Sequence, residues 1–334
     1  MLNLGENPDR LQKQRLAAQL GFFLLFALAP VLDIFRIDLV AGHAVIFGND
    51  WRLGIDAFLA HRIGTGEMAA NLFLRLFLPL IAAAAAFLFI AWRWGRLYCG
   101  WLCPHFAVVE TINDLMRRAI GKPSLWDRET LPARHPDGTP ISQNGAWWLA
   151  VLPTAVGVGF VWAVVLLSYL LPPAEVYGNL ATLSPTRNQA LFITIATAAF
   201  TAEFLFARHL FCRFGCAVGV FQSLVWMANR KAMVVGFERS RAAHCADCYA
   251  ADGPGHAVCE GVCPMRLRPR LAKHKMFTCT QCGQCLTACA TVEGQRGRAP
   301  LLNWVAGEAA RQHEAPVSLT GRRDVATKTT KGAS

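Results

Sequence analysis

The sequence predicts an all-α membrane domain of four transmembrane helices in two pseudo-repeats, followed by a small α+β domain that is rich in cysteine. Three observations lead to this prediction. The chain contains four long apolar stretches, a Cys-x3-Cys pair follows the second and the fourth of them, and eight of the 12 cysteines fall between Cys245 and Cys289. We place the membrane domain at residues 1–235, the cysteine-rich domain at 236–300, and a flexible polar tail at 301–334.

The amino-acid composition is that of a membrane protein. Of the 334 residues, 54% are apolar and 16% are charged, whereas soluble proteins have about 25% charged residues. The net charge of +11 is spread over the segments that flank the apolar stretches and does not gather in one patch. Membrane topology therefore explains this charge better than binding to nucleic acid does, and we expect no nucleic acid among the partners.

The four apolar stretches cover residues 16–36, 69–92, 146–171 and 189–211. Each is long enough to cross a hydrocarbon layer of about 30 Å. Because backbone groups in lipid must be hydrogen-bonded within the chain, we predict four helices, in which Pro79 and Pro153 are tolerated as kinks. The first stretch has the shape of a signal-peptide core, but it is long and lacks a small-residue cleavage site, so we expect it to be retained.

Lysine and arginine are concentrated on one side of the predicted helices. The N-terminal segment, the loop after the second stretch and the segment after the fourth are basic, while the other two loops are poorer in these residues. Cytoplasmic loops carry the excess of lysine and arginine. We therefore predict a multi-pass protein of the bacterial inner (cytoplasmic) membrane, in contact with membrane lipid, with both termini and the cysteine-rich domain in the cytoplasm.

The ends of the second and fourth apolar stretches resemble each other, because each carries a pair of cysteines four positions apart. The pairs are Cys99 with Cys103 and Cys212 with Cys216. Positions i and i+4 share a helix face, so each pair can present two thiolates, and the repeat can bring all four to one spot at the cytoplasmic face. Such thiolates suit copper(I), zinc or an iron–sulfur cluster, or act as a dithiol redox couple. The alternative is that these cysteines are only small buried apolar residues.

The second half of the cysteine-rich domain has the C-x2-C-x2-C-x3-C spacing of bacterial ferredoxins, with cysteines at 279, 282, 285 and 289. In this pattern three closely spaced thiolates hold one [4Fe-4S] cluster and the fourth reaches the neighbouring cluster. A zinc site would need only four ligands, usually as two separated C-x2-C pairs. The spacing therefore predicts an iron–sulfur cluster.

An earlier run of four cysteines is a stretched version of the same pattern, with an insertion at residues 249–258 that contains turn-forming glycine and proline. The two-cluster pattern predicts one cluster on Cys245, Cys248, Cys259 and Cys289, and a second on Cys279, Cys282, Cys285 and Cys263. If the insertion spoiled the first site, one cluster would remain. We therefore predict a bacterial 2[4Fe-4S] ferredoxin-like domain with two [4Fe-4S] clusters, and a copper ion as a candidate ligand of the Cys-x3-Cys pairs.

Three polar residues near the apolar stretches are weaker candidates. Glu203 lies inside the fourth stretch, where a carboxylate suits proton or quinol chemistry, although a neutral, hydrogen-bonded acid is an equal alternative. His105 and His209 lie beside the cysteine pairs in the sequence. Each is a candidate for an extra metal ligand or a proton donor, and the alternative is an ordinary histidine at the membrane interface. The sequence shows no bis-histidine haem arrangement and no phosphate-binding glycine motif, so haem, flavin and nicotinamide gain no support.

Several motifs together resemble a known group of proteins. They are Ile46 to Gly48, Tyr98 to Pro104, Cys212 to Cys216, Phe221 to Ser223 and the paired cluster runs. Over Asp38 to Cys289 the chain resembles the membrane polyferredoxins of the FixG/CcoG/RdxA type, which are related to NapH and NosR. The resemblance implies reduction of Cu(II) to Cu(I) for oxidase assembly, with assembly factors as partners. Ala217 replaces an expected proline, the first cluster run has its insertion, and the family's C-terminal span and sandwich domain are missing.

Three functions fit these features. In the first, electrons pass between the clusters and the Cys-x3-Cys thiolates, which reduce a metal ion or a partner protein; the chain would then be an oxidoreductase such as a cupric reductase. In the second, the chain is a quinol-linked subunit of a reductase, with Glu203 near the quinone. In the third, it is a copper chaperone or assembly scaffold without catalytic turnover.

Overall fold

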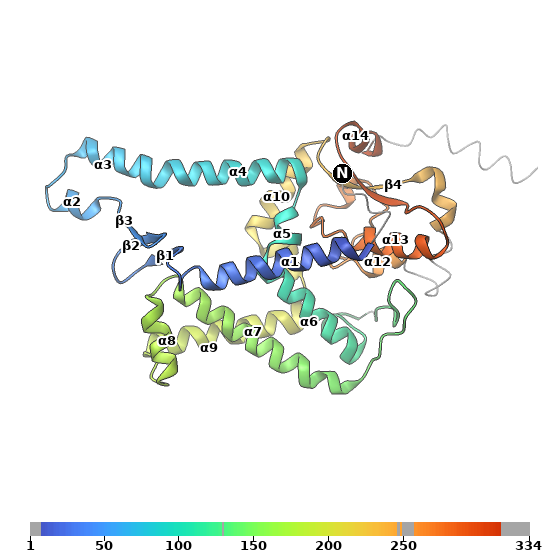
Figure 1. Cartoon of the computed structure of the whole chain (residues 1–334), viewed down its shortest axis with the longest axis horizontal. Helices are drawn as coiled ribbons and strands as arrows, with labels where there is room; N and C mark the ends of the chain where they lie inside the picture. Colours follow the sequence, from blue (N-terminus) through green and yellow to red (C-terminus); the bar gives the residue numbers. More distant parts are fainter. Residues whose placement is uncertain (1–7, 129, 246–247, 249–256, 315–334) are drawn as a thin grey trace, which may run out of the picture.

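The computed structural model describes residues 8–128, 130–245, 248 and 257–314. The fold is largely helical, and the cysteine-rich part lies at one end of the long helices, beside the beginning of helix α1 (Figure 1). Three helical segments are long and apolar enough to cross a membrane, namely Thr65–Trp94, Gly145–Ser168 and Arg187–Ala207. These segments indicate a membrane protein.

The first predicted span is wrong at its C-terminal end. Helix α1 (Pro8–Leu28) stops at Leu28 rather than at residue 36, and Pro30, which has no backbone N–H to donate, follows it. The chain then enters an antiparallel sheet of β1 (Phe35–Asp38), β2 (His43–Ile46) and β3 (Asn49–Trp51). Ile46 pairs with Asn49 across a two-residue turn in which Phe47 and Gly48 both have positive φ, as a type I′ turn requires. The part predicted as all-α therefore contains a small sheet.

The second predicted span is one continuous helix after the short α2 (Ile55–Leu59). It consists of α3 (Thr65–Leu72), the π-helical turn η1 (Phe73–Phe77) and α4 (Leu78–Trp94). Pro79 is the second residue of α4, and the wide turn before it accommodates the missing N–H. No residue in its most apolar window is buried, and the helix runs as a separate arm in Figure 1. Most of this helix is therefore exposed, and only the C-terminal end of α4, around the buried Ala91, packs on α10 (Ala217–Ala228).

The other two spans form the core of the membrane part. Helix α7 (Trp148–Ser168), preceded by the turn η2 (Gly145–Trp147), packs along α9 (Arg187–Ala202), and α8 (Pro173–Ala181) connects them. The two helices approach closely at Gly159, where an added Cβ would lie 3.2 Å from the carbonyl oxygen of Thr197. A capping box of Thr186 and Gln189 starts α9, and the π-helical turn η3 (Glu203–Ala207) ends the span.

The two Cys-x3-Cys pairs have the same local structure. The first cysteine of each pair lies on a short helix: Cys99 on α5 (Leu97–Trp101), which α6 (Pro104–Ile120) follows, and Cys212 on η4 (Phe211–Gly215), which α10 (Ala217–Ala228) follows. In both cases the second cysteine, Cys103 or Cys216, is the extended N-cap residue of the following helix. The pairs therefore sit at equivalent bends between two helices.

The cysteine-rich part is organised around a two-stranded antiparallel sheet of β4 (Val234–Phe237) and β5 (Leu302–Val305). Between the strands lie η5 (Arg239–Cys245), α12 (Val258–Gly261), η6 (Lys273–Lys275) and α13 (Gln284–Gln295). Val234, Val235, Leu286 and Leu302 form its buried core. The sheet and the following α14 (Glu308–Glu314) contradict the boundaries predicted at residues 235 and 300, because β4 pairs with residues assigned to the polar tail. Residues 249–256 of the predicted insertion and residues 315–334 of the predicted tail lie outside the described residues.

The membrane part and the cysteine-rich part meet at the first cysteine pair. An added Cβ on Gly100 would lie 2.2 Å from the carbonyl oxygen of Thr280 and 3.2 Å from the backbone nitrogen of Cys282. The indole Nε1 of Trp101 donates to the carbonyl oxygen of Gln281 at 3.0 Å. Only glycine fits at position 100, because the two backbones are in direct contact there.

We predict that Gly100→Ala disrupts this contact. The added methyl group cannot be accommodated without moving one backbone, so unfolding should be easier by about 1–3 kcal/mol, as in other overpacked sites. The measurement is the thermal unfolding midpoint of the purified protein in detergent. Gly157→Ala is the matched control, since Gly157 lies in α7 and a Cβ added there would meet no heavy atom within 4 Å, so this change should not lower the midpoint. Equal midpoints for the two variants would contradict the prediction.

Candidate functional site

Two small cavities in the cysteine-rich part are each lined by four cysteines. The first is lined by Cys263, Cys279, Cys282 and Cys285, together with apolar side chains such as Met265 and Met276. The second is lined by Cys245, Cys248, Cys259 and Cys289, together with Phe237, Leu302 and Arg270. These are the two sets of four that the spacing predicts. Helix α13 contributes Cys285 to the first cavity and Cys289, one turn later, to the second.

The thiols in these cavities fit an iron–sulfur cluster. All eight cysteines are free, and backbone N–H groups point at the sulfurs of Cys263 (3.4 Å, from Leu267) and Cys289 (3.3 Å, from Leu301). Within the described ranges, no three metal-ligating side chains converge closely enough for a single metal ion. Four thiols that surround a space, rather than a point, suit a multi-atom cluster, which would supply one-electron redox chemistry.

Burial keeps these thiols protonated when no metal is bound. Burial raises the pKa of Cys279 to about 12 and that of Cys263 to about 11, in both cases with added repulsion from the neighbouring Cys282. Since thiolates are the ligands, loading of the cavities must release protons. The free energy of cluster binding therefore includes the cost of deprotonating buried thiols.

The four cysteines of the Cys-x3-Cys pairs lie within electrostatic reach of one another. Burial, followed by the charges of Cys99 and Cys216, raises the pKa of Cys103 to about 11, while backbone N–H groups of α6 oppose this shift. Burial and the charges of Cys103 and Cys99 also raise the pKa of Cys212. The thiol of Cys99 donates to Oε1 of Gln222 in α10 at 3.1 Å, across the two halves. We call this group of four cysteines the thiolate site.

A buried arginine accompanies the thiolate site. Arg96 is 1% exposed, and its Nη2 donates to the carbonyl oxygen of Cys212 at 2.6 Å. Its guanidinium occupies the space beside Gly219, where an added Cβ would lie 2.3 Å from Nη2. The charge of Arg96 opposes the effect of burial on the pKa of Cys99. Arg96 therefore supplies positive charge where the site would hold negative charge.

The thiolate site adjoins the first of the two cysteine-lined cavities. Cys103 and Cys212 pack in one apolar cluster with Phe106, Met265 and Cys263. Cys263 also lines the first cavity, and the Gly100 contact places the backbone of Cys282 against the first pair. The three sites therefore form a contiguous series. The thiolate site adjoins the first cavity, and α13 joins the first cavity to the second.

The structure brings two of the weaker candidates together and leaves the third apart. His105 Nε2 and Glu203 Oε1 are 3.0 Å apart, each 17% exposed, beside the rings of Phe200, Phe204 and Phe211. His209 is buried, its ring is 4.6 Å from that of Phe106, and its Nδ1 is 3.2 Å from Nδ2 of Asn113. Burial and the charge of Arg208 hold the pKa of His209 well below its usual value. Neither histidine joins the cysteines in a group that could hold one ion within the described ranges.

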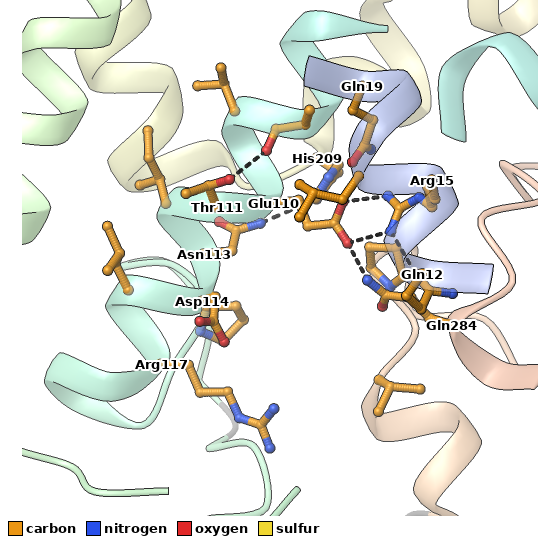
Figure 2. A pocket seen from close by; sticks show the side chains of 18 of the residues that line it. Gln12, Arg15, Gln19, Glu110, Thr111, Asn113, Asp114, Arg117, His209 and Gln284 are labelled. Atoms are coloured by element: carbon orange, nitrogen blue, oxygen red, sulfur yellow. Dashed lines mark hydrogen bonds and ion pairs between the residues drawn. The ribbon is translucent and has the colours of Figure 1, made fainter. Parts of the chain in front are cut away.

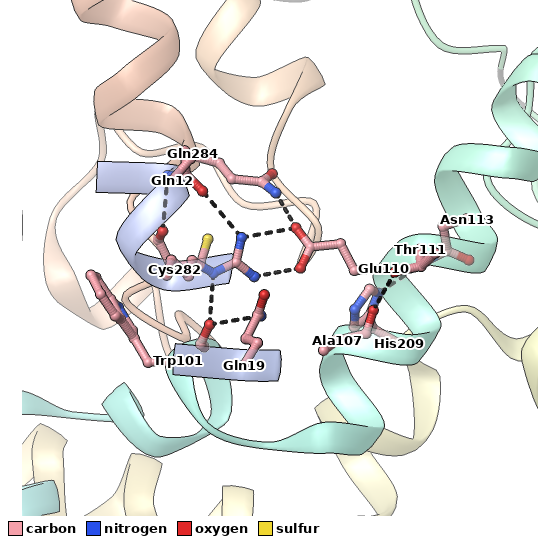
Figure 3. A network of polar contacts seen from close by, with 12 residues as sticks. Gln12, Gln19, Trp101, Ala107, Glu110, Thr111, Asn113, His209, Cys282 and Gln284 are labelled. Atoms are coloured by element: carbon pink, nitrogen blue, oxygen red, sulfur yellow. Dashed lines mark hydrogen bonds and ion pairs between the residues drawn. The ribbon is translucent and has the colours of Figure 1, made fainter. Parts of the chain in front are cut away.

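An ion-paired network that the sequence did not reveal ties α1 to both cysteine regions (Figure 3). Arg15, which is 4% exposed, forms an ion pair with Glu110 of α6, and its Nε donates to the carbonyl oxygen of Gly100 at 2.7 Å. Gln284 of α13 also donates to Glu110, and Gln12 donates to the carbonyl oxygen of Cys282 at 3.3 Å. In the sequence Arg15 was only one of many basic residues near an apolar stretch, so no signal marked it.

Comparisons with known proteins agree with the cysteine chemistry. The chain matches the family described as "4Fe-4S binding domain" over residues 76–123 and 189–233, two segments that each contain one Cys-x3-Cys pair. It is 25% identical over 219 residues to YccM of Escherichia coli strain K12, a protein named for electron transport; the match covers 64% of this chain and 55% of YccM. The chain thus spans just over half the length of that relative. No solved structure matches.

The fold and the cysteine sites define a class of protein, an iron–sulfur protein of the membrane. Two of its segments match a 4Fe-4S binding domain, and over part of its length the chain is similar to a protein named for electron transport.

We predict that Glu110→Gln weakens the attachment of α1 to the rest of the protein. The substitution leaves the guanidinium of Arg15 buried without its anion, which should lower the free energy of unfolding by up to about 3 kcal/mol. The loss is smaller than for a fully buried ion pair because Glu110 is 22% exposed. The thermal unfolding midpoint measures this effect. Adding Arg15→Met should recover part of the loss, because the double variant contains no unpaired charge. Additive losses in the double variant would show that the two residues do not interact.

Proposed function

We propose that the chain passes electrons between two [4Fe-4S] clusters and the thiolate site, where they reduce a metal ion such as Cu(II) or a partner protein. The observation that carries this proposal is the contact between the two regions: Gly100 against the Thr280–Cys282 backbone, and Cys103, Cys212 and Cys263 in one apolar cluster. Electron transfer between separate centres requires them to be close, and this packing supports a direct route.

The two clusters would be held by the two sets of four cysteines. Cys263, Cys279, Cys282 and Cys285 would hold the cluster nearer the thiolate site, and Cys245, Cys248, Cys259 and Cys289 the more distant one. Each cluster takes up or gives one electron. The charge of Arg270, whose Nη1 lies 3.7 Å from the sulfur of Cys245, would compensate the anionic cluster in the second cavity.

The thiolate site would be the point of exit. Soft thiolates stabilise copper(I), so a Cu(II) substrate that reaches these cysteines is easier to reduce. The two segments that match the 4Fe-4S family contain no other cysteines than Cys99, Cys103, Cys212 and Cys216, which also supports iron–sulfur chemistry at this site. The pair of Glu203 and His105 beside it would supply or accept protons.

We further propose that α1 is a fourth membrane span, and that both termini and the clusters are cytoplasmic in the bacterial inner membrane. The equivalent bends at the two cysteine pairs support two pseudo-repeats. The residues from 1 to about 233 would form the membrane domain, and the ferredoxin-like domain would run from β4 to α14. The resemblance to the FixG/CcoG type implies that this reduction of Cu(II) to Cu(I) would serve oxidase assembly.

We predict that the double variant Cys99→Ser/Cys103→Ser abolishes Cu(II) reduction by chemically reduced protein. Serine cannot serve as the soft ligand, while the eight cysteines of the two cavities are unchanged. Formation of Cu(I), followed with a chromogenic chelator, is the measurement. Iron and sulfide content serves as the control and should remain at the level of the unmodified protein. Full activity in this variant would rule out the thiolate site as the exit.

The number of clusters can be counted directly. Two [4Fe-4S] clusters predict about eight iron and eight sulfide atoms per chain after anaerobic purification, with a [4Fe-4S]⁺ signal in electron paramagnetic resonance after reduction. Cys248→Ser and Cys282→Ser should each lower the count by about four. A count near twelve, lowered by the Cys99→Ser/Cys103→Ser variant, would contradict the two-cluster proposal and assign a further cluster to the thiolate site.

A further inference from the structure

A large cavity lies outside all of the cysteine sites. It has a volume of about 840 Å³ and lies between α1, α6, α7 and the cysteine-rich part (Figure 2). Glu203 and His105 do not line it. A volume of this size is typical of pockets for small organic ligands.

One side of this cavity is apolar, and it would face the lipid if α1 is the fourth span proposed above. Leu16, Leu20 and Phe23 of α1 line it, and both leucines are 55% exposed. Val158 lines it from α7, which belongs to a segment apolar enough to span the membrane. A ligand that is dissolved in lipid could therefore enter from the side without crossing water.

The opposite side is polar and contains two buried atoms without a hydrogen-bond partner. The amide nitrogen Nδ2 of Asn113 can only donate a hydrogen bond, so Nδ1 of His209 is the acceptor in this contact. In a neutral His209 ring the single ring proton is then on Nε2. This Nε2 and Oδ1 of Asn113 are both buried, and neither makes a hydrogen bond of normal geometry with a described residue, although the backbone of Phe106 lies close to the His209 ring. The wall thus combines one free donor and one free acceptor, which is the combination that a phenolic hydroxyl group satisfies.

The charges along the cavity argue against a phosphate group as the ligand. Of the four arginines that line it, three are paired with carboxylates: Arg15 with Glu110, Arg118 with Asp114 and Arg208 with Asp127. The fourth, Arg117, donates to the carbonyl oxygen of Pro132. A phosphate would have to compete with these pairs. A neutral polar ring with a long apolar tail matches both sides of the cavity.

The cavity also reaches the helix that carries cluster ligands. Gln284, Thr287 and Ala288 of α13 line it, and the same helix contributes Cys285 and Cys289 to the two cysteine-lined cavities. Arg15 lines the cavity and lies within electrostatic reach of Cys282. A redox-active ring in this cavity would be adjacent to the electron-transfer part of the protein.

We propose that this cavity binds the ring of a quinone or quinol, a lipid-soluble carrier of two electrons. Oxidation of one bound quinol breaks two O–H bonds and yields one quinone, two protons and two electrons. If the two cysteine-lined cavities hold the proposed clusters, each cluster would accept one of these electrons, and the two protons would pass to water. In this respect the inference rests on the proposed function. The quinol would be the electron donor, and its site is distinct from the Glu203 region.

The test is the affinity of the iron-loaded protein, in nanodiscs of a single phospholipid, for a decyl-benzoquinone, measured by isothermal titration calorimetry. Leu20→Trp fills the cavity and should weaken binding about tenfold or more. Leu24→Trp is the matched control, because Leu24 is equally exposed (57%) one turn further along α1 but does not line the cavity; its affinity should stay within about twofold. Iron content must be unchanged in both variants.

A second variant tests the polar wall separately. Asn113→Leu removes both hydrogen-bonding groups at similar volume and should weaken binding about tenfold, since a buried partner is lost. Failure of the unmodified protein to bind the quinone saturably, or equal affinity in Leu20→Trp and Leu24→Trp, would overturn the proposal. So would a tightly bound phospholipid, found by native mass spectrometry, that the quinone does not displace. Quinone binding should persist in the Cys99→Ser/Cys103→Ser variant. A protein that binds quinone but does not reduce Cu(II) would therefore contradict only the proposed exit site, and one that reduces Cu(II) without binding quinone would contradict only this inference.

Discussion

The arrangement of the cysteine sites depends on a direct contact between two stretches of backbone. Gly100, in the middle of the first Cys-x3-Cys pair, lies against Thr280 and Cys282 in the loop that carries the ferredoxin-type cysteines. Neither stretch can shift along the other, because the carbonyl oxygens of Gly100 and Gln281 are also fixed by Arg15 and Trp101. The geometry between the thiolate site and the nearer cavity is therefore set by a backbone contact that the side chains of Arg15 and Trp101 reinforce. Such rigid positioning limits the movement needed when an electron passes.

Burial of many thiols links folding of the cysteine-rich part to its cofactor. The part described has a modest apolar core around Val235 and Leu286, and five of its cysteines are buried as well. When protonated, these thiols are weak hydrogen-bonding groups and behave as small apolar residues. When they bind a cluster, the covalent ligands replace much of the core that a small domain lacks. The short strands β4 and β5 then need only to hold the two ends of the domain together.

The sequence was most informative where the chemistry depends on local spacing. The two sets of four cysteines gather as their spacing predicts, because neighbouring ligands in a C-x2-C run are held together by a few residues of backbone. Contacts between distant segments were not predictable in this way. The pairing of β4 with β5 joins four-residue strands that are too short to give a periodic pattern, and residues after 300 therefore looked like a tail. Arg15 and Arg96 were indistinguishable from the basic residues that set membrane topology, although the structure buries both.

The replacement of proline by alanine at position 217 shows what the Cys-x3-Cys-Pro motif requires. Pro104 and Ala217 each occupy the first position of the helix that follows the cysteine pair. At this position the backbone N–H has no partner within the helix, so proline is favoured but not necessary. The preceding cysteines have nearly the same backbone conformation, with φ and ψ of −62° and 114° for Cys103 and −77° and 106° for Cys216. The bend, and with it the direction of the second thiol of each pair, therefore depends on the extended cysteine at the helix N-cap. Proline stabilises that bend in the first half, and the second half forms it without proline, so the departure from the family motif leaves the thiolate site intact.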